Sequence, residues 1–335
     1  MSSRYPKLIL GVPVLCALVA LACSAPQPEK SNQGQDQPFV VGVVTWVGSG
    51  PFFLAKNKGL FGDSNVQISI IDDAAGRRAA LSQGSIQAMA ATVDDFANAA
   101  AAGLPAVAIL KTDDSFGGDG IVASADIKTV KDLAGKTVAF PQGMPSHFFL
   151  IEILKRNGLS LKDLNVRYME AGQAGAAFVA GKVDAAVTWE PWLSKAAERE
   201  GGHVLVTTRD SPGLISDIVV ASRDAAANRA GDVTAFVRGW FSAVDYLHAH
   251  PKDSNALMAK ALSLPLDQWD SILAGIRYSD LANNRDYFGL GGSPSKFDAV
   301  FTTAGEVWQR QGLVDKPASA TDHVDTRFLM ALSPE

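Results

Sequence analysis

The feature that most restricts the fold is a repeated alternation of short apolar strands with short helices, which begins at residue 39. Strands that alternate with helices favour parallel sheets covered by helices on both faces. The sequence therefore predicts an α/β fold. The predicted strands are 39–46, 66–71, 86–92, 106–111, 121–124, 137–140, 166–169, 185–187, 203–207 and 215–221.

From residue 225 onward the pattern is mainly helical. In the first helix of this region one face stays apolar at helical spacing and is expected to pack in the core. That face consists of Phe236, Trp240, Val244 and Leu247. The predicted helices are 233–250, 254–263, 266–277 and 295–311.

The strand-rich part divides into two units, and the chain is long enough for two lobes. We expect a first lobe from 39–117 and 218–335, a second lobe from 118–217, and a helical C-terminal region that packs on the first. The segment 113–119, Asp-Asp-Ser-Phe-Gly-Gly-Asp, is the expected first crossing, because its glycines permit turn geometry. The acidic side chains of this segment are expected to be solvated.

The N-terminal segment predicts export. Arg4 and Lys7 precede an apolar run at 8–22, and small residues then lead to Cys23. This arrangement resembles a bacterial lipoprotein signal, which implies a signal peptide at 1–22 and a lipid on Cys23. Because the run falls short of the roughly 20 residues of a membrane-spanning helix, a transmembrane segment is the weaker alternative.

Residues 23–38 are rich in Pro, Gln and Ser and lack an apolar period, so they predict a flexible tether between the lipid and the folded domain. The expected location is the periplasm or cell envelope, at a membrane. Cys16 and Cys23 are the two cysteines of the sequence, so a mature domain offers no thiol for a disulfide, a metal or a nucleophile. The net charge of −5 and the absence of a basic stripe argue against nucleic acid as a partner.

Candidate binding residues fall where strands give way to helices, the edge that faces the ligand crevice in an open α/β sheet. In the first lobe these are Trp46, Ser49 and Asp95, and Asp94 is expected to cap the helix. In the second lobe they are Ser146, His147, Trp189 and Glu190, and Asp217 lies on the returning strand. The alternatives are a core tryptophan, a helix cap or a surface carboxylate, and Trp192 is interpreted as packing.

Several separated segments resemble the substrate-binding proteins of ABC importers in the nitrate, sulfonate and taurine family. They are 46–55, 58–61, 133–139, Trp189-Glu190-Pro191 and 237–251, in the family's order. The resemblance implies a periplasmic-binding protein fold of type II, with two α/β lobes, two hinge strands and a small-molecule solute clamped between them. It also implies a membrane permease with its ATPase as partners, a monomeric protein, and no cofactor or metal.

The charges of the candidate residues favour a particular solute. Asp95, Glu190 and Asp217 are acids, and the same motifs contain no Lys or Arg. Because an uncompensated buried charge is costly, a cationic or donor-rich planar solute is expected, such as an amidine or an aminopyrimidine. The family's usual solutes are sulfonate, taurine and nitrate, and helix N-termini could still bind an anion.

Two other functions stay open. An enzyme of the related pyrimidine-precursor type depends on a cysteine-rich motif, which this chain lacks, although Glu190 and His147 could act as an acid and base pair. The sequence contains no His-Glu-x-x-His helix, no Gly-x-Ser-x-Gly elbow and no phosphate-binding loop with Gly-Lys-Ser or Gly-Lys-Thr. A lipoprotein that binds a solute to signal or scaffold, without feeding a permease, is not excluded by the sequence.

Overall fold

The first of two sheets combines strands from both halves of the chain. A computed structural model describes residues 37–332. In this sheet the order is β11-β4-β10-β3-β1-β2, with β1 parallel to β2 and β3, and β10 antiparallel to β3 and β4. Its strands are β1 (Phe39–Val43), β2 (Val66–Ile70), β3 (Ala88–Thr92), β4 (Ala106–Ser115), β10 (Ser216–Ser222) and β11 (Ile276–Tyr278).

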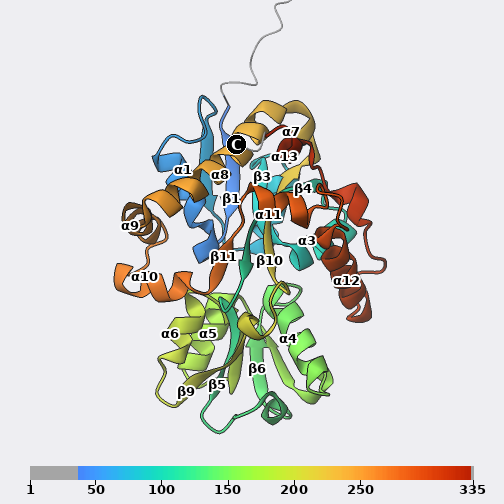
Figure 1. Cartoon of the computed structure of the whole chain (residues 1–335). Coiled ribbons are helices and arrows are strands. Elements are labelled where there is room, and N and C mark those ends of the chain that lie inside the picture. Colours follow the sequence, from blue (N-terminus) through green and yellow to red (C-terminus); the bar gives the residue numbers. More distant parts are fainter. Residues whose placement is uncertain (1–36, 333–335) are drawn as a thin grey trace, which may run out of the picture.

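The second sheet is built from the intervening chain alone. Its order is β7-β6-β8-β5-β9, and β6 runs parallel to both β7 and β8. We call each sheet with its helices a lobe, and Figure 1 shows lobe 1 above lobe 2. The strands of lobe 2 are β5 (Asp119–Ser124), β6 (Thr137–Phe140), β7 (Asn165–Tyr168), β8 (Ala185–Trp189) and β9 (Gly202–Thr207).

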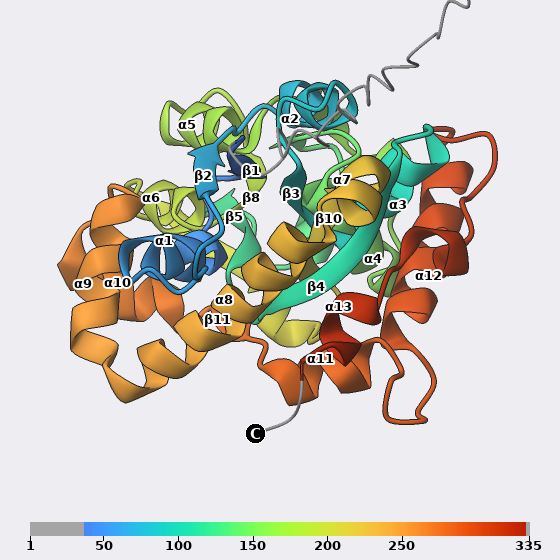
Figure 2. The same cartoon turned by 90° about the horizontal axis from the view of Figure 1, so that it is seen from above.

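Helices cover both sheets, and those of the C-terminal region belong to lobe 1. Viewed from above, α9 and α10 lie at one end of that lobe and α12 at the other (Figure 2). Lobe 2 contains α4 (Pro145–Arg156), α5 (Ala171–Val179) and α6 (Trp192–Ala197). Lobe 1 contains α1 (Gly50–Asn57), α2 (Ala74–Ser82), α3 (Val93–Ala101), α7 (Arg223–Asn228), α8 (Ala230–Ala249), α9 (Pro251–Ala261), α10 (Leu266–Leu273), α11 (Leu281–Tyr287), α12 (Lys296–Arg310) and α13 (Arg327–Met330).

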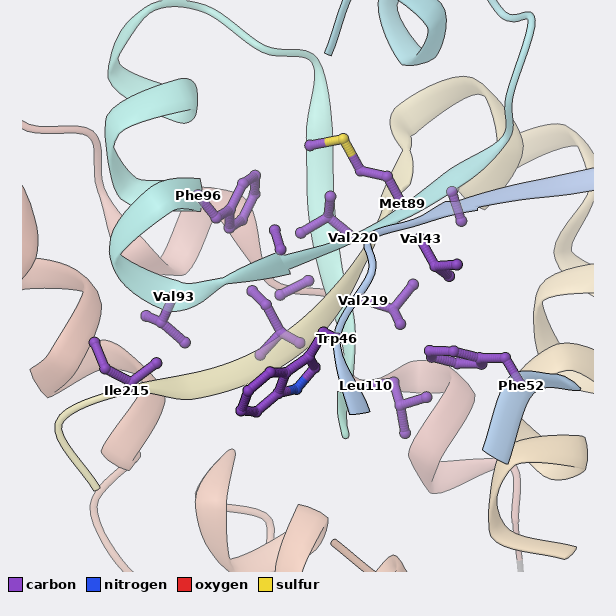
Figure 3. Packing of buried hydrophobic residues seen from close by; sticks show 14 of the residues in the cluster. Val43, Trp46, Phe52, Met89, Val93, Phe96, Leu110, Ile215, Val219 and Val220 are labelled. Carbon is purple, nitrogen blue, oxygen red and sulfur yellow. The ribbon is translucent and has the colours of Figure 1, made fainter. Parts of the chain in front are cut away.

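The structure confirms the predicted α/β architecture and the predicted core face of α8. Phe236 and Trp240 are fully buried, and the ring of Phe52 on α1 packs 5.5 Å from the first and 4.7 Å from the second, between centroids. Figure 3 shows Phe52 beside Val219 and other side chains of the lobe 1 sheet. Burial of these large aromatic groups fixes the C-terminal helices against the first sheet.

The predicted helix 266–277 is wrong in its last turn. Helix α10 ends at Leu273, and Ile276 to Tyr278 form β11, an edge strand that pairs with β4. The backbone at Gly275 approaches Gly118 so closely that a Cβ there would lie 3.0 Å from the Gly118 nitrogen. Pairing with a strand distant in sequence therefore overrides the local helical pattern.

Two connections join the lobes. Strand β4 runs past its predicted end to Ser115 and reaches β5 through a short turn in which Gly117 has a φ of 118°. The chain returns to lobe 1 through β10, whose Asp217 lies opposite Asp113 of β4 beside a bulge. Bulges commonly redirect side chains next to functional sites. The residue-level lobe boundaries stay a prediction.

The predicted signal peptide 1–22, Cys23 and all of the tether before residue 37 lie outside the described residues. Within residues 37–332, no helix combines the length and the apolar character that crossing a membrane requires.

Candidate functional site

A small cavity lies between the lobes, at the ends of strands β1, β3 and β8. Its volume is about 40 Å³, which gives room for about three water molecules. Both lobes line the cavity, so a solute larger than this volume requires the lobes to move apart or side chains to shift. The lining residues are Val44, Trp46, Gly48, Ser49, Phe52, Arg77, Ala90, Ala91, Thr92, Asp95, Thr112, Asp113, Asp119, Met144, Pro145, Trp189, Ile215 and Asp217.

The structure brings most of the predicted site residues to this cavity. Those that line it are Trp46, Ser49, Asp95, Trp189 and Asp217. Ser146, His147 and Glu190 are not among the lining residues. The prediction missed Arg77, Asp113 and Asp119, which also line it.

Asp113 projects from strand β4 into the cavity and is fully buried. The indole Nε1 of Trp46 donates a hydrogen bond of 3.2 Å to its Oδ1, while its Oδ2 has no hydrogen-bond partner among residues 37–332. Burial raises the pKa of this carboxyl to about 7. The expectation that the acids of 113–119 are solvated is therefore wrong for Asp113.

Two further carboxylates face the same space. Asp119, at the start of β5, is 3% exposed, and burial raises its pKa to about 7. Asp217 is partly exposed and lies opposite Asp113 in the register of β10 and β4. Its pKa is raised well above the usual value by burial and by the neighbouring charges of Asp113 and Asp119. Three acids thus converge where the two lobes join.

Another wall of the cavity combines a carboxylate with a guanidinium group. Asp95 lies in the first turn of α3, is 1% exposed and forms an ion pair with Arg78. Its Oδ2 has no partner within the described part of the chain. Buried Arg77 donates from Nη1 to the carbonyl of Ile71 over 2.7 Å, and burial lowers its pKa. This wall offers the one guanidinium among the lining residues.

The cap of α3 differs from the prediction. Thr92, not Asp94, is the N-cap, and its hydroxyl accepts a hydrogen bond from the backbone N–H of Asp95. Asp94 is buried in the first helical turn, and burial raises the pKa of its carboxyl to about 8. Thr92, at the end of β3, thus supplies the capping oxygen that the sequence assigned to Asp94, and the helix begins one residue before Asp94.

Of the three predicted residues outside the lining, His147 and Glu190 make hydrogen bonds within lobe 2, while the buried hydroxyl of Ser146 has no partner among residues 37–332. Ser146 and His147 are buried in the first turn of α4, where Nδ1 of His147 accepts from the Gly143 N–H over 3.0 Å. Burial lowers the pKa of His147 to about 4. Glu190 accepts from the hydroxyl of Ser194 over 2.7 Å at the start of α6, and burial raises its pKa. Their roles in solute binding stay predictions.

Direct contacts hold the two lobes together beside the cavity. Nε1 of Trp189 in lobe 2 donates to the carbonyl of Thr45 in lobe 1 over 3.3 Å. On the other side of the cavity, Nδ2 of Asn98 donates to the carbonyl of Gly143 over 3.3 Å. The structure is therefore a closed arrangement of the lobes.

The described part of the chain contains no group of three or more His, Cys, Asp or Glu side chains arranged to hold a metal ion. The polar groups of the cavity are suited to hydrogen bonds and ion pairs with a small solute. This geometry is that of a binding site formed by closure of two lobes.

Comparison with known proteins assigns the family. Residues 46–254, more than half of the chain, match the NMT1/THI5-like family. The chain belongs to this family. The matched range begins at the cavity residue Trp46 and extends through both hinge strands into α9.

Curated relatives of this NMT1/THI5-like protein are binding proteins. A putative aliphatic sulfonates-binding protein of Escherichia coli (strain K12) is 36% identical over 149 residues, 43% of this chain and 45% of that protein. A putative ABC transporter periplasmic binding protein of Brachyspira hyodysenteriae is 32% identical over 121 residues, 36% of this chain and 34% of that protein. The matches thus span less than half the length of these relatives.

Solved structures share the periplasmic-binding protein fold. The periplasmic aliphatic sulphonate binding protein SsuA from Escherichia coli has a TM-score of 0.72 at 24% identity, over 86% of this chain and 92% of that one. The desulfurization enzyme DSZB has a TM-score of 0.62 at 14% identity, over 88% of this chain and 98% of that one. This NMT1/THI5-like fold therefore occurs in binding proteins and in an enzyme.

Removing either interlobe hydrogen bond is expected to favour the open arrangement. Trp189→Phe and Asn98→Ala each delete one donor, and a typical hydrogen bond is worth about 0.5–1.5 kcal/mol, or about a 2- to 10-fold change in the ratio of closed to open molecules. Small-angle X-ray scattering should show a larger radius of gyration for both variants. Asn165→Ala, which removes an amide-to-carbonyl bond within lobe 2, is the matched control and should leave it unchanged. An unchanged radius in both interlobe variants contradicts this role.

Proposed function

We propose that this protein is the solute-binding component of an ABC importer, which captures a small organic solute between its lobes and delivers it to a membrane permease and its ATPase. The observation that carries the proposal is the cavity lined by both lobes beside two hinge strands. Membership of the NMT1/THI5-like family and the binding-protein relatives support it. A solute that contacts both walls stabilises the closed state, which a permease can then recognise.

The proposed solute is cationic or rich in hydrogen-bond donors. Asp95, Asp113, Asp119 and Asp217 line the cavity with one arginine, Arg77. Because Asp95 is paired with Arg78, the other three carboxyls are set against that single arginine. The Oδ2 atoms of Asp95 and Asp113 are buried and have no partner among residues 37–332. Buried polar atoms that lack a hydrogen bond are costly, and a planar amidinium or an aminopyrimidine supplies donors for them.

A sulfonate is the second candidate, and one residue favours it. Buried Arg77 lines the cavity and could pair with an anionic group, and the relatives named above include sulfonate-binding proteins. A sulfonate would also have to face Asp113, Asp119 and Asp217, whose charges repel it. The balance of charge therefore supports the cation. An enzymatic role has less support, because the relatives are binding proteins.

We propose further that the protein is a periplasmic or cell-envelope lipoprotein anchored through Cys23. The sequence of 1–23 and the periplasmic binding proteins among the relatives support this location.

Matched solutes of opposite charge test the proposed solute class. Benzamidinium and benzenesulfonate share a planar ring and differ in charge. At about 100 times its dissociation constant, benzamidinium is expected to raise the melting temperature by about 5 °C or more. Asp217→Asn should reduce this shift, while Asp126→Asn, a surface substitution in lobe 2, should preserve it. Stabilisation by benzenesulfonate alone would reverse the proposed charge preference.

Lipidation is testable in the native host or a bacterial expression host. Labelled palmitate should be incorporated into the wild-type protein and not into Cys23→Ser, and the wild-type protein should fractionate with membranes. Cys16→Ser, within the predicted signal peptide, is the matched control and should still be labelled. Equal labelling of wild type and Cys23→Ser contradicts the proposed anchor.

A further inference from the structure

Asp113 and Trp46 connect the cavity wall to the turn between the lobes. Trp46 follows β1, and its Nε1 donates to Asp113 on hinge strand β4. The far edge of its indole lies against the turn: a Cβ at Gly118 would be 2.4 Å from Cη2 of Trp46 and 3.0 Å from the carbonyl of Gly275. The ring therefore contacts the segment that must change when the lobes separate.

Gly48 lies on the other side of the Trp46–Asp113 pair, where a larger residue would not fit. A Cβ at Gly48 would lie 2.2 Å from Nε1 of Trp46 and 2.4 Å from Oδ2 of Asp113. The backbones of Gly48 and Gly118 thus approach the Trp46 ring closely and restrict it to one position. In that position Trp46 binds Oδ1 of Asp113 and leaves Oδ2 without a partner among residues 37–332.

In the closed arrangement, Asp119 of lobe 2 joins two carboxylates that already lie opposite each other within the sheet of lobe 1. Asp217 is opposite Asp113 on the neighbouring strand, and Asp119 begins the first strand of lobe 2. Like charges directly opposite each other destabilise a pair of strands. Asp113 and Asp119 are buried in the closed arrangement, so ionisation of all three carboxyls there is opposed by desolvation and by repulsion.

We propose that Asp113, positioned by Trp46, is the specificity-determining carboxylate that makes lobe closure depend on a cation. The positive group of the solute meets Oδ2 of Asp113 between Asp119 and Asp217, offsets their repulsion, and so allows the hinge to close. Protons substitute for the cation at low pH. This inference rests on the proposed binding function, and it places the group that makes closure depend on the solute at the hinge.

The surroundings of Asp113 determine the direction of the pH dependence. It is faced by Lys111 and Asp114 on its own strand, Asp217 on β10, Tyr278 on β11 and Asp119 on β5.

Burial in the closed arrangement raises the pKa of Asp113 and Asp119 from the ordinary value of about 3.8 to about 7. We infer that opening, which lets water reach both carboxyls, lowers these pKa values again. The cation-free closed state is therefore favoured below about pH 4, loses stability as pH rises to about 7, and changes little above that. Cation affinity is expected to rise over the same interval.

The first test uses the protein without added solute. Small-angle X-ray scattering from pH 5 to pH 8 should show the radius of gyration of the wild type increasing, as closure becomes unfavourable. Asp113→Asn keeps an oxygen for Trp46 but carries no charge, so its radius should increase much less. Trp46→Phe keeps a ring but removes the donor, so Asp113 holds its proton to higher pH and the opening midpoint should move upward. Equal pH profiles for all three proteins overturn the proposal.

The second test measures benzamidinium affinity by calorimetry at pH 8. Asp113→Asn should weaken binding about 10-fold or more. Gly118→Ala, which displaces Trp46 without changing charge, should weaken it as well. Gly231→Ala is the matched control, because its Cβ would enter open space, and it should bind as the wild type does.

The outcomes separate this inference from the proposed solute class. Benzamidinium binding that is equal in wild type and Asp113→Asn overturns the inference while the solute class stands. Binding of benzenesulfonate in place of benzamidinium overturns the solute class and also the role of a cation in closure. The expected scattering profiles would then still assign the pH dependence of closure to Asp113.

Discussion

The mutual repulsion of Asp113 and Asp217 across the hinge strands is the constraint on which the rest of the site depends. Both strands belong to lobe 1, yet their acidic ends border the cavity that lobe 2 closes. Burial there is tolerable only if a proton or a cation compensates the charge. Trp46, Gly48 and the turn at Gly118 are arranged around this pair. The geometry of the hinge therefore positions the carboxylates that select the charge of the solute.

Much of the fold could be predicted because its signals are local. Alternating apolar segments specified the two sheets, and the spacing of Phe236 and Trp240 specified the buried face of α8. The error at 266–277 arose because β11 exists only through its pairing with β4, more than 150 residues earlier. Local spacing contains no information about such a partner.

The site was only partly predictable, for the same reason. Trp46, Asp95 and Trp189 end strands or begin helices, and sheet topology brings such positions to one edge. Asp113 and Asp119 stand in an acidic, glycine-containing segment that looks solvated, and their burial comes from the pairing of β4 with β10 and of β5 with β8. Arg77 is on α2, away from any expected strand end.

We propose that this NMT1/THI5-like protein binds its solute through a carboxylate-rich hinge, although several relatives are named for sulfonates. Native mass spectrometry of the purified protein, with fragmentation of the released solute, tests it most directly. We expect a small molecule with a basic nitrogen, retained at one per chain and lost on substitution Asp113→Asn. A retained sulfonate without a basic group, bound equally by wild type and Asp113→Asn, would contradict it.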